Sequence, residues 1–542
     1  MGTFSVMKFL KLRKLFSKEE VKSSGNRDQL SSSRRKFLGH GFLAALGGGL
    51  LAGSREGGAQ ETTSPISSGM VIEGRRRNSP ARLEYSDGIE AAWKKVKEEA
   101  SPEDLYRVLY ALPKGGDIHH HLGGGMLPEM IYEICTDPKR NGGQTFYARV
   151  RISTLNLAEI GGHQDSRSLS GWVTIATHTY DKLDASLQSD FKRLDALNEK
   201  EKRAWMNAMF LDHAGEGRNE FFEYIWNRLD DVLVSIDVMM ELTIENMKRF
   251  GAEGVRYLEI QSRFRGWFDG NGNVISMDQA TKMWLDRFDQ PDAKATGVLV
   301  RFQTIVLRFS PNAIQGVEEY FEYTHHHPEL WLGINMAGRE DDNRGYPSKF
   351  TDVFDRMLRK FPGVGISIHA GEAEKKDTHI FDTLRLGATR IGHGINLYRD
   401  PQTMQMMRGE NFLIEINLIS NHLLGYVPDL DEHPFPIYMR QGIPCCLNTD
   451  DRGMWHSNMT DEYFVAVSRY NLTWKEMITL GENSIKHSFL NDEMKSKMLS
   501  EYYADVMAFS KKLESGSWKS IARSSNAVTY DYGKNHLNLN LS

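Results

Sequence analysis

Short apolar runs of strand character alternate with helix-like segments along most of the chain. The runs cover residues 115–122, 254–261, 297–309, 331–337, 364–370, 390–394, 412–419 and 443–449. Segments with apolar residues at helical spacing separate most of these runs, as at 232–250, 313–323, 352–360 and 377–386. Eight such alternations are what a TIM (β/α)8 barrel requires, so the pattern predicts an α/β fold of that type.

The alternation follows two predicted helices and is interrupted once. Residues 85–112 carry apolar side chains at helical spacing, and Ser101-Pro102 is typical of a helix start. Residues 127–200 lack sustained periodicity, which predicts an insertion after the first strand, on the active-site side. We therefore expect a linker and N-terminal helices over 61–112, the barrel over 113–515, and a polar, peripheral C-terminal tail over 516–542.

Composition and charge narrow the function classes. A formal net charge of -5 over 542 residues gives no reason to expect a nucleic-acid partner. No apolar run reaches the roughly 20 residues of a spanning helix, so we expect no stable membrane insertion after removal of any signal. Cys135, Cys445 and Cys446 form no disulfide framework, and we interpret them as small core residues.

The first 60 residues have the order of an export signal. A basic, polar stretch ends in Arg34-Arg35, a weakly apolar run continues to about Ala52, and a Gly-rich stretch reaches Gln60. This order predicts a twin-arginine signal over 1–60, the alternative being a basic patch beside a short helix. The mature protein would then be exported, to a bacterial periplasm or beyond it, by a route that carries folded proteins.

Candidate metal ligands stand at the end of the first run. Because side chains alternate along a strand, His119 and His121 share one face while His120 points to the other. Two imidazoles on one face can hold one metal ion, whereas His120 is expected to be structural. The glycines at 123–125 let the backbone turn tightly after the pair.

Three later run ends supply the remaining chemistry. The fifth run ends in His369 with Glu372 three residues on, the sixth in His393 between two glycines, and the eighth in Asp450-Asp451. His369 and Asp450 complete a His3Asp set, Glu372 is placed as a proton donor, and Asp451 is free for substrate. The set suits one Zn²⁺ per chain, with iron, cobalt and manganese as alternatives. Zinc would lower the pKa of bound water from 15.7 to about 7, which predicts a hydrolytic reaction.

These segments together resemble the adenosine deaminase family of metal-dependent hydrolases, over about residues 105–500. They are Pro113-Lys114, His369 to Glu372, Arg390 to Gly394 and Leu447 to Asp451, supported by Gly333 to Glu340, Glu415 to Gly425, and His433-Pro434. Residues 113–116 and the preceding helices are most similar to the secreted growth-factor branch, in which an insertion follows the first strand. The family fold is a TIM barrel, in agreement with the strand count.

The resemblance implies hydrolytic deamination of adenosine and deoxyadenosine to inosine and ammonia by a zinc-activated hydroxide. The implied zinc ligands are His119, His121, His369 and Asp450. Glu372 would protonate N1 of the purine, and His393 would orient the hydroxide that attacks C6. Asp451 would contact N7, and the backbone N–H of Gly338 would contact N3.

The chain departs from the family pattern on the sugar side. Deaminases outside the growth-factor branch carry a sugar-contacting aspartate where this chain has Gly123, and the growth-factor branch carries one where it has Leu122. Arg452 replaces a usual proline, and Asn335 replaces a usual aspartate. Residues of the insertion, such as those near Trp172, are candidates for the missing sugar contact.

Several other clusters are expected to have ordinary structural roles. His325-His326-His327 is expected to be a polar loop, and aromatic residues Trp205, Phe221, Phe222 and Trp226 are expected to pack a helix onto the core. The motif of nucleobase deaminases, H-x-E with P-C-x-x-C, is incomplete.

Two alternatives to adenosine deamination remain open. The chain could deaminate another 6-aminopurine nucleoside, or it could be an extracellular adenosine-binding protein with vestigial catalysis. The expected ligand is in each case a small purine nucleoside. A homodimer through the N-terminal helices is a further expectation.

Overall fold

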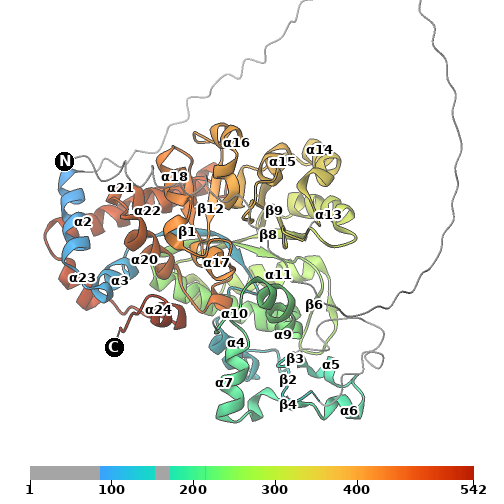
Figure 1. Ribbon diagram of the computed structural model, residues 1–542. Coiled ribbons are helices and arrows are strands. Elements are labelled where there is room, and N and C mark those ends of the chain that lie inside the picture. Colours follow the sequence, from blue (N-terminus) through green and yellow to red (C-terminus); the bar gives the residue numbers. More distant parts are fainter. Residues whose placement is uncertain (1–85, 153–170, 214, 343, 542) are drawn as a thin grey trace, which may run out of the picture. The chain divides into compact units, whose positions relative to one another are not determined.

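Eight parallel strands form the central sheet of the computed structural model, which describes residues 86–152, 171–213, 215–342 and 344–541 (Figure 1). In spatial order they are β1 (Gly115–His121), β5 (Val255–Ser262), β8 (Leu299–Leu307), β9 (Trp331–Ala337), β10 (Gly365–Ala370), β11 (Arg390–His393), β12 (Leu413–Ile416) and β13 (Cys445–Leu447). Each strand lies within a predicted run or within one residue of it. The predicted TIM barrel is confirmed.

The first and last strands meet at the carboxyl end of the barrel. The backbone N–H of Asp450 donates to the carbonyl of His119 at 3.0 Å, and the N–H of His121 donates to the carbonyl of Asp450 at 3.1 Å. A parallel bridge therefore joins His120 to Asp450, three residues beyond the end of β13. The sheet closes at the same level as the predicted metal ligands.

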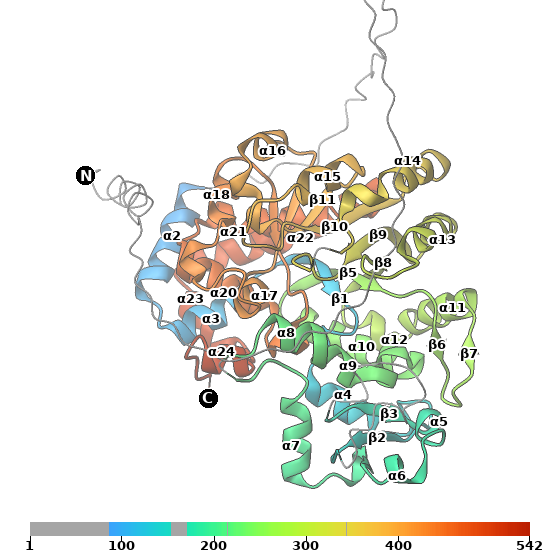
Figure 2. The same ribbon diagram turned by 45° about the vertical axis from the view of Figure 1, so that its right-hand side comes forward.

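Helices of the β/α alternation lie outside the strands, as Figure 2 shows from a second direction. They include α10 (Ile236–Ala252), α11 (Met277–Phe288), α13 (Ala313–His326), α14 (Thr351–Lys360), α15 (His379–Arg385), α16 (Pro401–Met406), α18 (Phe435–Arg440), α20 (Met459–Tyr470), α21 (Trp474–Lys486) and α22 (Asp492–Glu514). In α14 the side chains of Val353, Phe354 and Met357 are buried, as the helical spacing of apolar residues predicts.

The two N-terminal helices, α2 (Asp87–Glu99) and α3 (Pro102–Tyr110), begin at serine caps. The Ser101 side chain accepts a hydrogen bond from the third residue of α3, as a favourable N-cap does. The apolar face of α2 packs against α21 and α22 of the same chain, where Trp93 meets Trp474 at 6.0 Å between ring centroids. The apolar face of α2 is thus already covered, and dimerisation through these helices stays a prediction.

The C-terminal segment contributes to the core. Helix α23 (Trp518–Ser524) packs against α3, and a short helix, α24 (Asp531–Asn535), follows. Trp518, Ile521, Tyr532 and Leu539 are buried. The expectation of a peripheral tail was wrong, because a few well-spaced apolar side chains anchor an otherwise polar segment.

The predicted insertion contains a small sheet of its own. Helix α4 (Pro128–Cys135) leads to three antiparallel strands in the order β3 (Thr174–Ala176), β2 (Phe146–Arg149) and β4 (Phe191–Arg193), followed by α7 (Glu199–Asn207). The buried indole of Trp205 donates to Thr174 Oγ1 at 2.8 Å and fastens α7 to this sheet. Strands of three or four residues are too short to give a periodic signal in the sequence.

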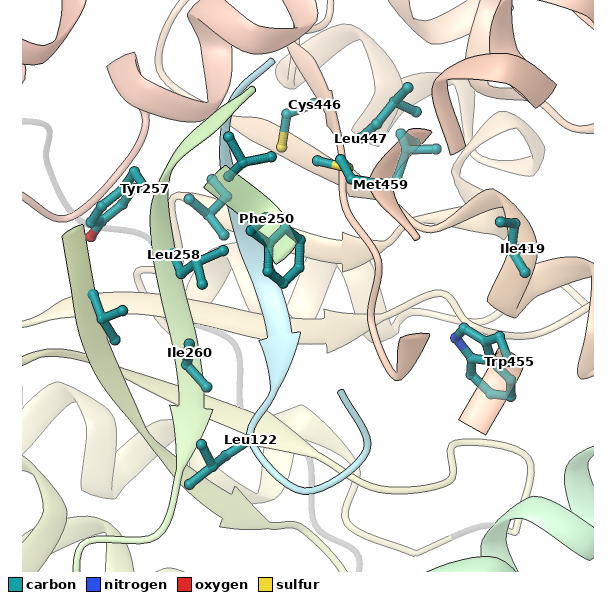
Figure 3. Close-up of a cluster of buried hydrophobic side chains, with 14 of the residues drawn as sticks. Leu122, Phe250, Tyr257, Leu258, Ile260, Ile419, Cys446, Leu447, Trp455 and Met459 are labelled. Atoms are coloured by element: carbon teal, nitrogen blue, oxygen red, sulfur yellow. The ribbon is translucent and has the colours of Figure 1, made fainter. Parts of the chain in front are cut away.

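The hydrophobic core continues around the strands, and Figure 3 shows part of it near β1, β5 and β13. Cys446 lies in this cluster, and all three cysteines are free and buried, as interpreted. Within the described part of the chain, no helix combines the length and apolar character needed to cross a membrane. The predicted export signal over 1–60 lies outside the described residues.

Candidate metal and catalytic site

Four predicted ligand side chains converge at the carboxyl end of the barrel. The Nε2 atoms of His119 and His121 lie 3.1 Å and 3.2 Å from Nε2 of His369. Asp450 Oδ1 lies 3.4 Å from the first of these histidines and 3.3 Å from the second. Tetrahedral zinc with bonds of about 2.0–2.1 Å separates its ligand atoms by about 3.3 Å, so the spacing fits one such ion.

Outer hydrogen bonds fix the orientation of two of these imidazoles. His119 Nδ1 lies 2.6 Å from Glu415 Oε2, and Glu415 also accepts from Arg390 Nε at 2.6 Å. Burial would raise the pKa of Glu415, but Arg390 and His119 lower it to about 2, so it is an anion that accepts the Nδ1 proton. The lone pair of His119 Nε2 therefore faces the cluster.

Asn335 performs the same task for His369. Its Oδ1 lies 2.9 Å from His369 Nδ1, so the amide oxygen accepts the ring proton and leaves Nε2 free. A departure noted in the sequence thus preserves a hydrogen-bond acceptor and removes only its charge. His120 turns the other way, toward Asn246 Nδ2 at 2.9 Å and Thr449 Oγ1 at 3.1 Å, as expected for a structural residue.

Gly392 makes room for the cluster. A Cβ at this position would lie 2.6 Å from Cε1 of His119, closer than real Cβ contacts come. The glycine beside His393 therefore accommodates the His119 ring. His393 itself has a φ of 65°, and Asp450 has a φ of 55°. Left-handed backbone at two non-glycine residues is the kind of strain that clusters at functional sites.

Glu372 is a buried acid beside this cluster. Burial raises its pKa well above the ordinary value, and the negative charges of Asp450 and Glu340 raise it further. Burial and these charges therefore favour the protonated carboxyl group. Glu340 holds the backbone of this loop by accepting hydrogen bonds from the amides of Gly371 at 3.0 Å and Glu372 at 3.2 Å.

His393 lies between the acid and the metal cluster. Its Nδ1 is 3.6 Å from Glu372 Oε1, and its Nε2 is 4.0 Å from Asp450 Oδ2. The amides of Asn417 and Asn421 reach Nδ1 at 3.2 Å and 2.9 Å, which makes Nδ1 the acceptor and leaves the proton on Nε2. Burial lowers the pKa of His393 to about 4, so the ring is neutral near pH 7.

Asp451 is buried and has an unpaired carboxylate oxygen, Oδ1, among the described residues. Burial and then the neighbouring Asp450 raise its pKa, which favours a protonated carboxyl able to donate. Gly124 is required beside it, because a Cβ there would lie 1.7 Å from Asp451 Oδ1. Gly338 follows β9 at the same end of the barrel, with a φ of 112°.

The sugar-side departures have structural causes. A Cβ on Gly123 would lie 2.7 Å from Leu233 Cδ2 and 3.0 Å from Trp226 Cζ3, so a side chain there would have to displace these two residues. Leu122 is buried in the core. Arg452 is also fully buried, paired with Glu253 Oε1 at 3.1 Å and stacked on the Phe250 ring, away from the cluster.

Trp226 packs against the core, as expected, but it also lies beside the metal cluster. It belongs to α9 (Trp226–Leu229), and its ring centroid lies 6.2 Å from that of His121. Trp172, the candidate for the sugar contact, lies between β2 and β3 of the insertion, where its backbone N–H donates to the carbonyl of Arg149. No motif marked Trp226, since only the folded chain brings it to the site.

The segment that contains Trp226 is fastened over the barrel mouth. Arg218, at the start of α8 (Arg218–Glu220), donates to Asp341 Oδ2 at 2.9 Å and to the carbonyl of Leu424 at 3.1 Å. Its guanidinium also lies 3.9 Å from the centroid of the Tyr426 ring. One arginine thus connects the loops after β9 and β12 to the segment above the cluster.

Two further clusters have structural roles. His325 and His326 end α13 in exposed positions, so the expected polar loop is the end of a helix. Glu340, Asp377 and His379 also lie close enough together to hold an ion. Glu340 Oε2 already pairs with His379 Nδ1 at 2.6 Å and holds the Glu372 loop. This second cluster is therefore explained by internal hydrogen bonds.

A parallel (β/α)8 barrel with three histidines, an aspartate and a buried acid at its strand ends defines a metal-dependent hydrolase. The sequence model of the adenosine deaminase family, described as "Adenosine deaminase", matches residues 195–505. The chain belongs to this family. The match begins after the first strand, so it does not include His119 and His121. The predicted growth-factor branch stays a prediction.

Individual relatives include deaminases of more than one kind. An adenosine deaminase of Aedes albopictus is 25% identical over 423 residues, covering 74% of both chains. An adenine deaminase of Chelativorans sp. (strain BNC1) is 31% identical over 208 residues, 38% of this chain and 61% of that protein. The chain thus spans less than two thirds of the second relative.

Solved structures share the fold at lower identity. An adenine deaminase from Arthrobacter aurescens has a TM-score of 0.52 at 21% identity, covering 73% of this chain and 99% of that one. An amidohydrolase from Burkholderia ambifaria with bound Zn has a TM-score of 0.53 at 15% identity, covering 76% and 95%. These likenesses support the fold alone.

Proposed function

We propose that the protein hydrolyses adenosine and deoxyadenosine to their inosine products and ammonia. The observation that carries this proposal is the convergence of four ligand atoms within 4.8 Å of one another beside Glu372, an acid whose pKa is raised by burial. Water and a 6-aminopurine give a 6-oxopurine and ammonia, so the reaction needs a nucleophile, a proton donor for the ring and a site for the amine to leave.

The residues present fit one Zn²⁺ ion. His119, His121, His369 and Asp450 would hold it, and the spacing of their ligand atoms matches a tetrahedral site. When bound, the ion supplies a water whose pKa is lowered toward about 7. A solved structure with the same fold contains Zn, which is consistent with this choice of metal.

The chain's own groups account for the other requirements. Glu372 would donate its proton to N1 of the purine, which makes C6 more electrophilic. Neutral His393 carries its proton on Nε2 and would orient the attacking water. A protonated Asp451 would donate to N7, and the backbone N–H of Gly338 would donate to N3, so that three contacts fix the ring.

Adenosine is favoured among 6-aminopurines because the longer of the two sequence relatives described is an adenosine deaminase. Another 6-aminopurine compound is a second candidate. One supporting observation is that Gly123, at the family's sugar-contact position, is filled by Leu233 and Trp226. A relative described as an adenine deaminase also supports it. The intact acid argues against the third alternative, a binding protein with vestigial catalysis.

Product analysis of the purified chain tests this proposal. The protein, with its metal content measured, would be incubated with adenosine, deoxyadenosine and adenine, and products separated by chromatography. We expect inosine and ammonia from adenosine, and loss of activity on chelation that Zn²⁺ restores. A zinc-loaded protein that releases no ammonia from adenosine contradicts the proposal, and a strong preference for adenine supports the second candidate.

We also propose that residues 1–60 direct twin-arginine export. The arginine pair, the apolar run and their position in the sequence support this. Replacing Arg34-Arg35 by Lys-Lys should keep the protein in the cytoplasm, measured by cell fractionation, whereas the same change at Arg76-Arg77, outside the signal, should leave export unchanged. Normal export of the Lys-Lys variant would contradict the route.

A further inference from the structure

One polar side chain at the barrel mouth lacks a partner. Gln261, the penultimate residue of β5, is 2% exposed, and neither its Oε1 nor its Nε2 makes a hydrogen bond among the described residues. Leaving a buried amide unpaired costs about 1–3 kcal/mol. Such a group calls for a partner from outside the chain.

Gln261 faces the interior of the barrel beside the metal cluster. It is the Cα partner of His121 in the parallel pairing of β1 with β5. Glu259, two residues earlier, faces inward and contacts Arg390 Nη1 at 2.6 Å and Gln303 Nε2 at 2.9 Å. Because side chains alternate along a strand, Gln261 shares this face one layer nearer the mouth.

The neighbouring inward glutamine shows that the barrel normally satisfies such groups. Gln303, on β8, donates through Nε2 to Glu259 Oε1 and to the carbonyl of Ile118 at 3.3 Å. Its Oε1 accepts from Asn335 Nδ2 at 3.4 Å. Both glutamines are buried and face inward, but only the one in the layer of the metal ligands is unpaired.

The proposed purine orientation directs the sugar toward this side, and the inference rests on the proposed function. Glu372, Gly338 and Asp451 follow β10, β9 and β13 and would contact N1, N3 and N7. N9, which bears the sugar, lies on the side of the ring away from N1. The sugar bond therefore points toward β1 and β5, which lie across the barrel from β10.

On that side a carboxylate at position 123 would have to displace Leu233 and Trp226. Leu233 and Trp226 close the position of Gly123 with apolar atoms. A ribose hydroxyl buried there would need another group that can both accept and donate a hydrogen bond, and a glutamine amide does both. We propose that Gln261 binds a sugar hydroxyl of the nucleoside and takes over recognition of the ribose from the missing aspartate.

Removing single hydroxyls from the substrate, and the amide of Gln261 from the enzyme, tests this assignment. The full chain, zinc-loaded, would be assayed for kcat/KM with adenosine and with 2′-, 3′- and 5′-deoxyadenosine. We expect one deoxy analogue to lose roughly tenfold to a hundredfold against adenosine in the native protein. Gln261→Met should lose a similar factor with adenosine and little more with that analogue, because the two changes remove the same hydrogen bond.

Controls separate recognition from damage to the barrel. Gln303→Met removes a satisfied structural amide and should lower kcat/KM by the same factor for all four substrates. Gln261→Asn, which keeps the amide but shortens its reach, should show the selectivity of Gln261→Met. Equal losses on all four substrates for both Gln261 variants would overturn the assignment.

Failure of the assignment can be told apart from failure of the proposed function. If the native protein deaminates adenosine but the Gln261 variants lose the same factor on all four substrates, the proposed function stands and the sugar contact is rejected. If the native protein is inactive on all four nucleosides, both the proposed function and the assignment of Gln261 are rejected. Unaltered kcat/KM in the Gln261 variants also rejects the contact.

Discussion

The two sides of the barrel mouth differ in the side chains that line them. On the side of β10, β11 and β13, Glu372, His393 and Asp451 are buried, and the amides of Asn417 and Asn421 fix the proton position of His393. On the side of β1 and β5, apolar Trp226 and Leu233 fill the space beside His121, and Gln261 has no partner. The first side agrees with the family motifs, whereas the second departs from them.

This difference separates chemistry from recognition. In the proposed reaction, protonating N1 and orienting the water that attacks C6 require groups with shifted pKa values, and each shift depends on several fixed neighbours. A sugar hydroxyl needs only one group that donates and accepts, and many positions can supply it. The reacting side is therefore restricted to a few residue types, while the sugar side can be rebuilt.

The largest effect should come from the acid. Glu372→Gln removes the proton donor but keeps the shape of the side chain, so kcat should fall by about 10² to 10⁴ with little change in zinc content. Exposed Glu410→Gln is the matched control and should leave kcat unchanged. An unaltered rate in Glu372→Gln would remove this residue from the mechanism and revive the binding-protein alternative.

A smaller effect is expected from the carboxylate behind His119. Glu415→Gln weakens the acceptor that fixes the tautomer of this ring, and metal affinity should fall roughly tenfold to a hundredfold. Competition with a chelator measures the affinity. The surface variant Glu318→Gln, which loses only an exposed pair with Arg356, should leave it unchanged. Equal affinities in both variants would contradict the orienting role of Glu415.

A change on the sugar side should act on binding. Trp226→Leu opens the space above Gly123, and loss of aromatic packing worth about 0.5–1.5 kcal/mol should raise KM for adenosine roughly twofold to tenfold. We expect kcat to stay close to the native value, and adenine, which has no sugar, to be unaffected. A fall in kcat as large as in Glu372→Gln would show that the two sides are not separate.

The smallest effect should be on pH dependence. Burial, Asp450 and Glu340 hold the pKa of Glu372 above its usual range, so kcat should decline as rising pH removes this proton. Glu340→Gln removes one of these charges, which lowers the pKa of Glu372 and moves the alkaline limb to lower pH. A pH–rate profile measures this. A limb that stays in place would mean that another group sets it.

The sequence predicted the barrel and its ligands because both leave local signals. The strands are apolar runs at regular intervals, and His119, His121, His369 and Asp450 stand at their ends. The residues that were missed have no such signal. Trp226 packs against the core as predicted, but no pattern indicates its place beside His121, and Gln261 lies in an ordinary strand. Their positions depend on contacts between segments far apart in sequence, as does the burial of Trp518 in the polar tail.

The bridge between His120 and Asp450 sets the order in which this protein can become active. His119 and His121 lie on the first strand, whereas Asp450 follows the last. During synthesis, more than 300 intervening residues must therefore emerge before the barrel closes and the four ligands meet. No truncated product ending before Asp450 can form the four-ligand site. The four-ligand site is therefore a property of a complete barrel, and a nascent chain that has not yet reached Asp450 lacks it.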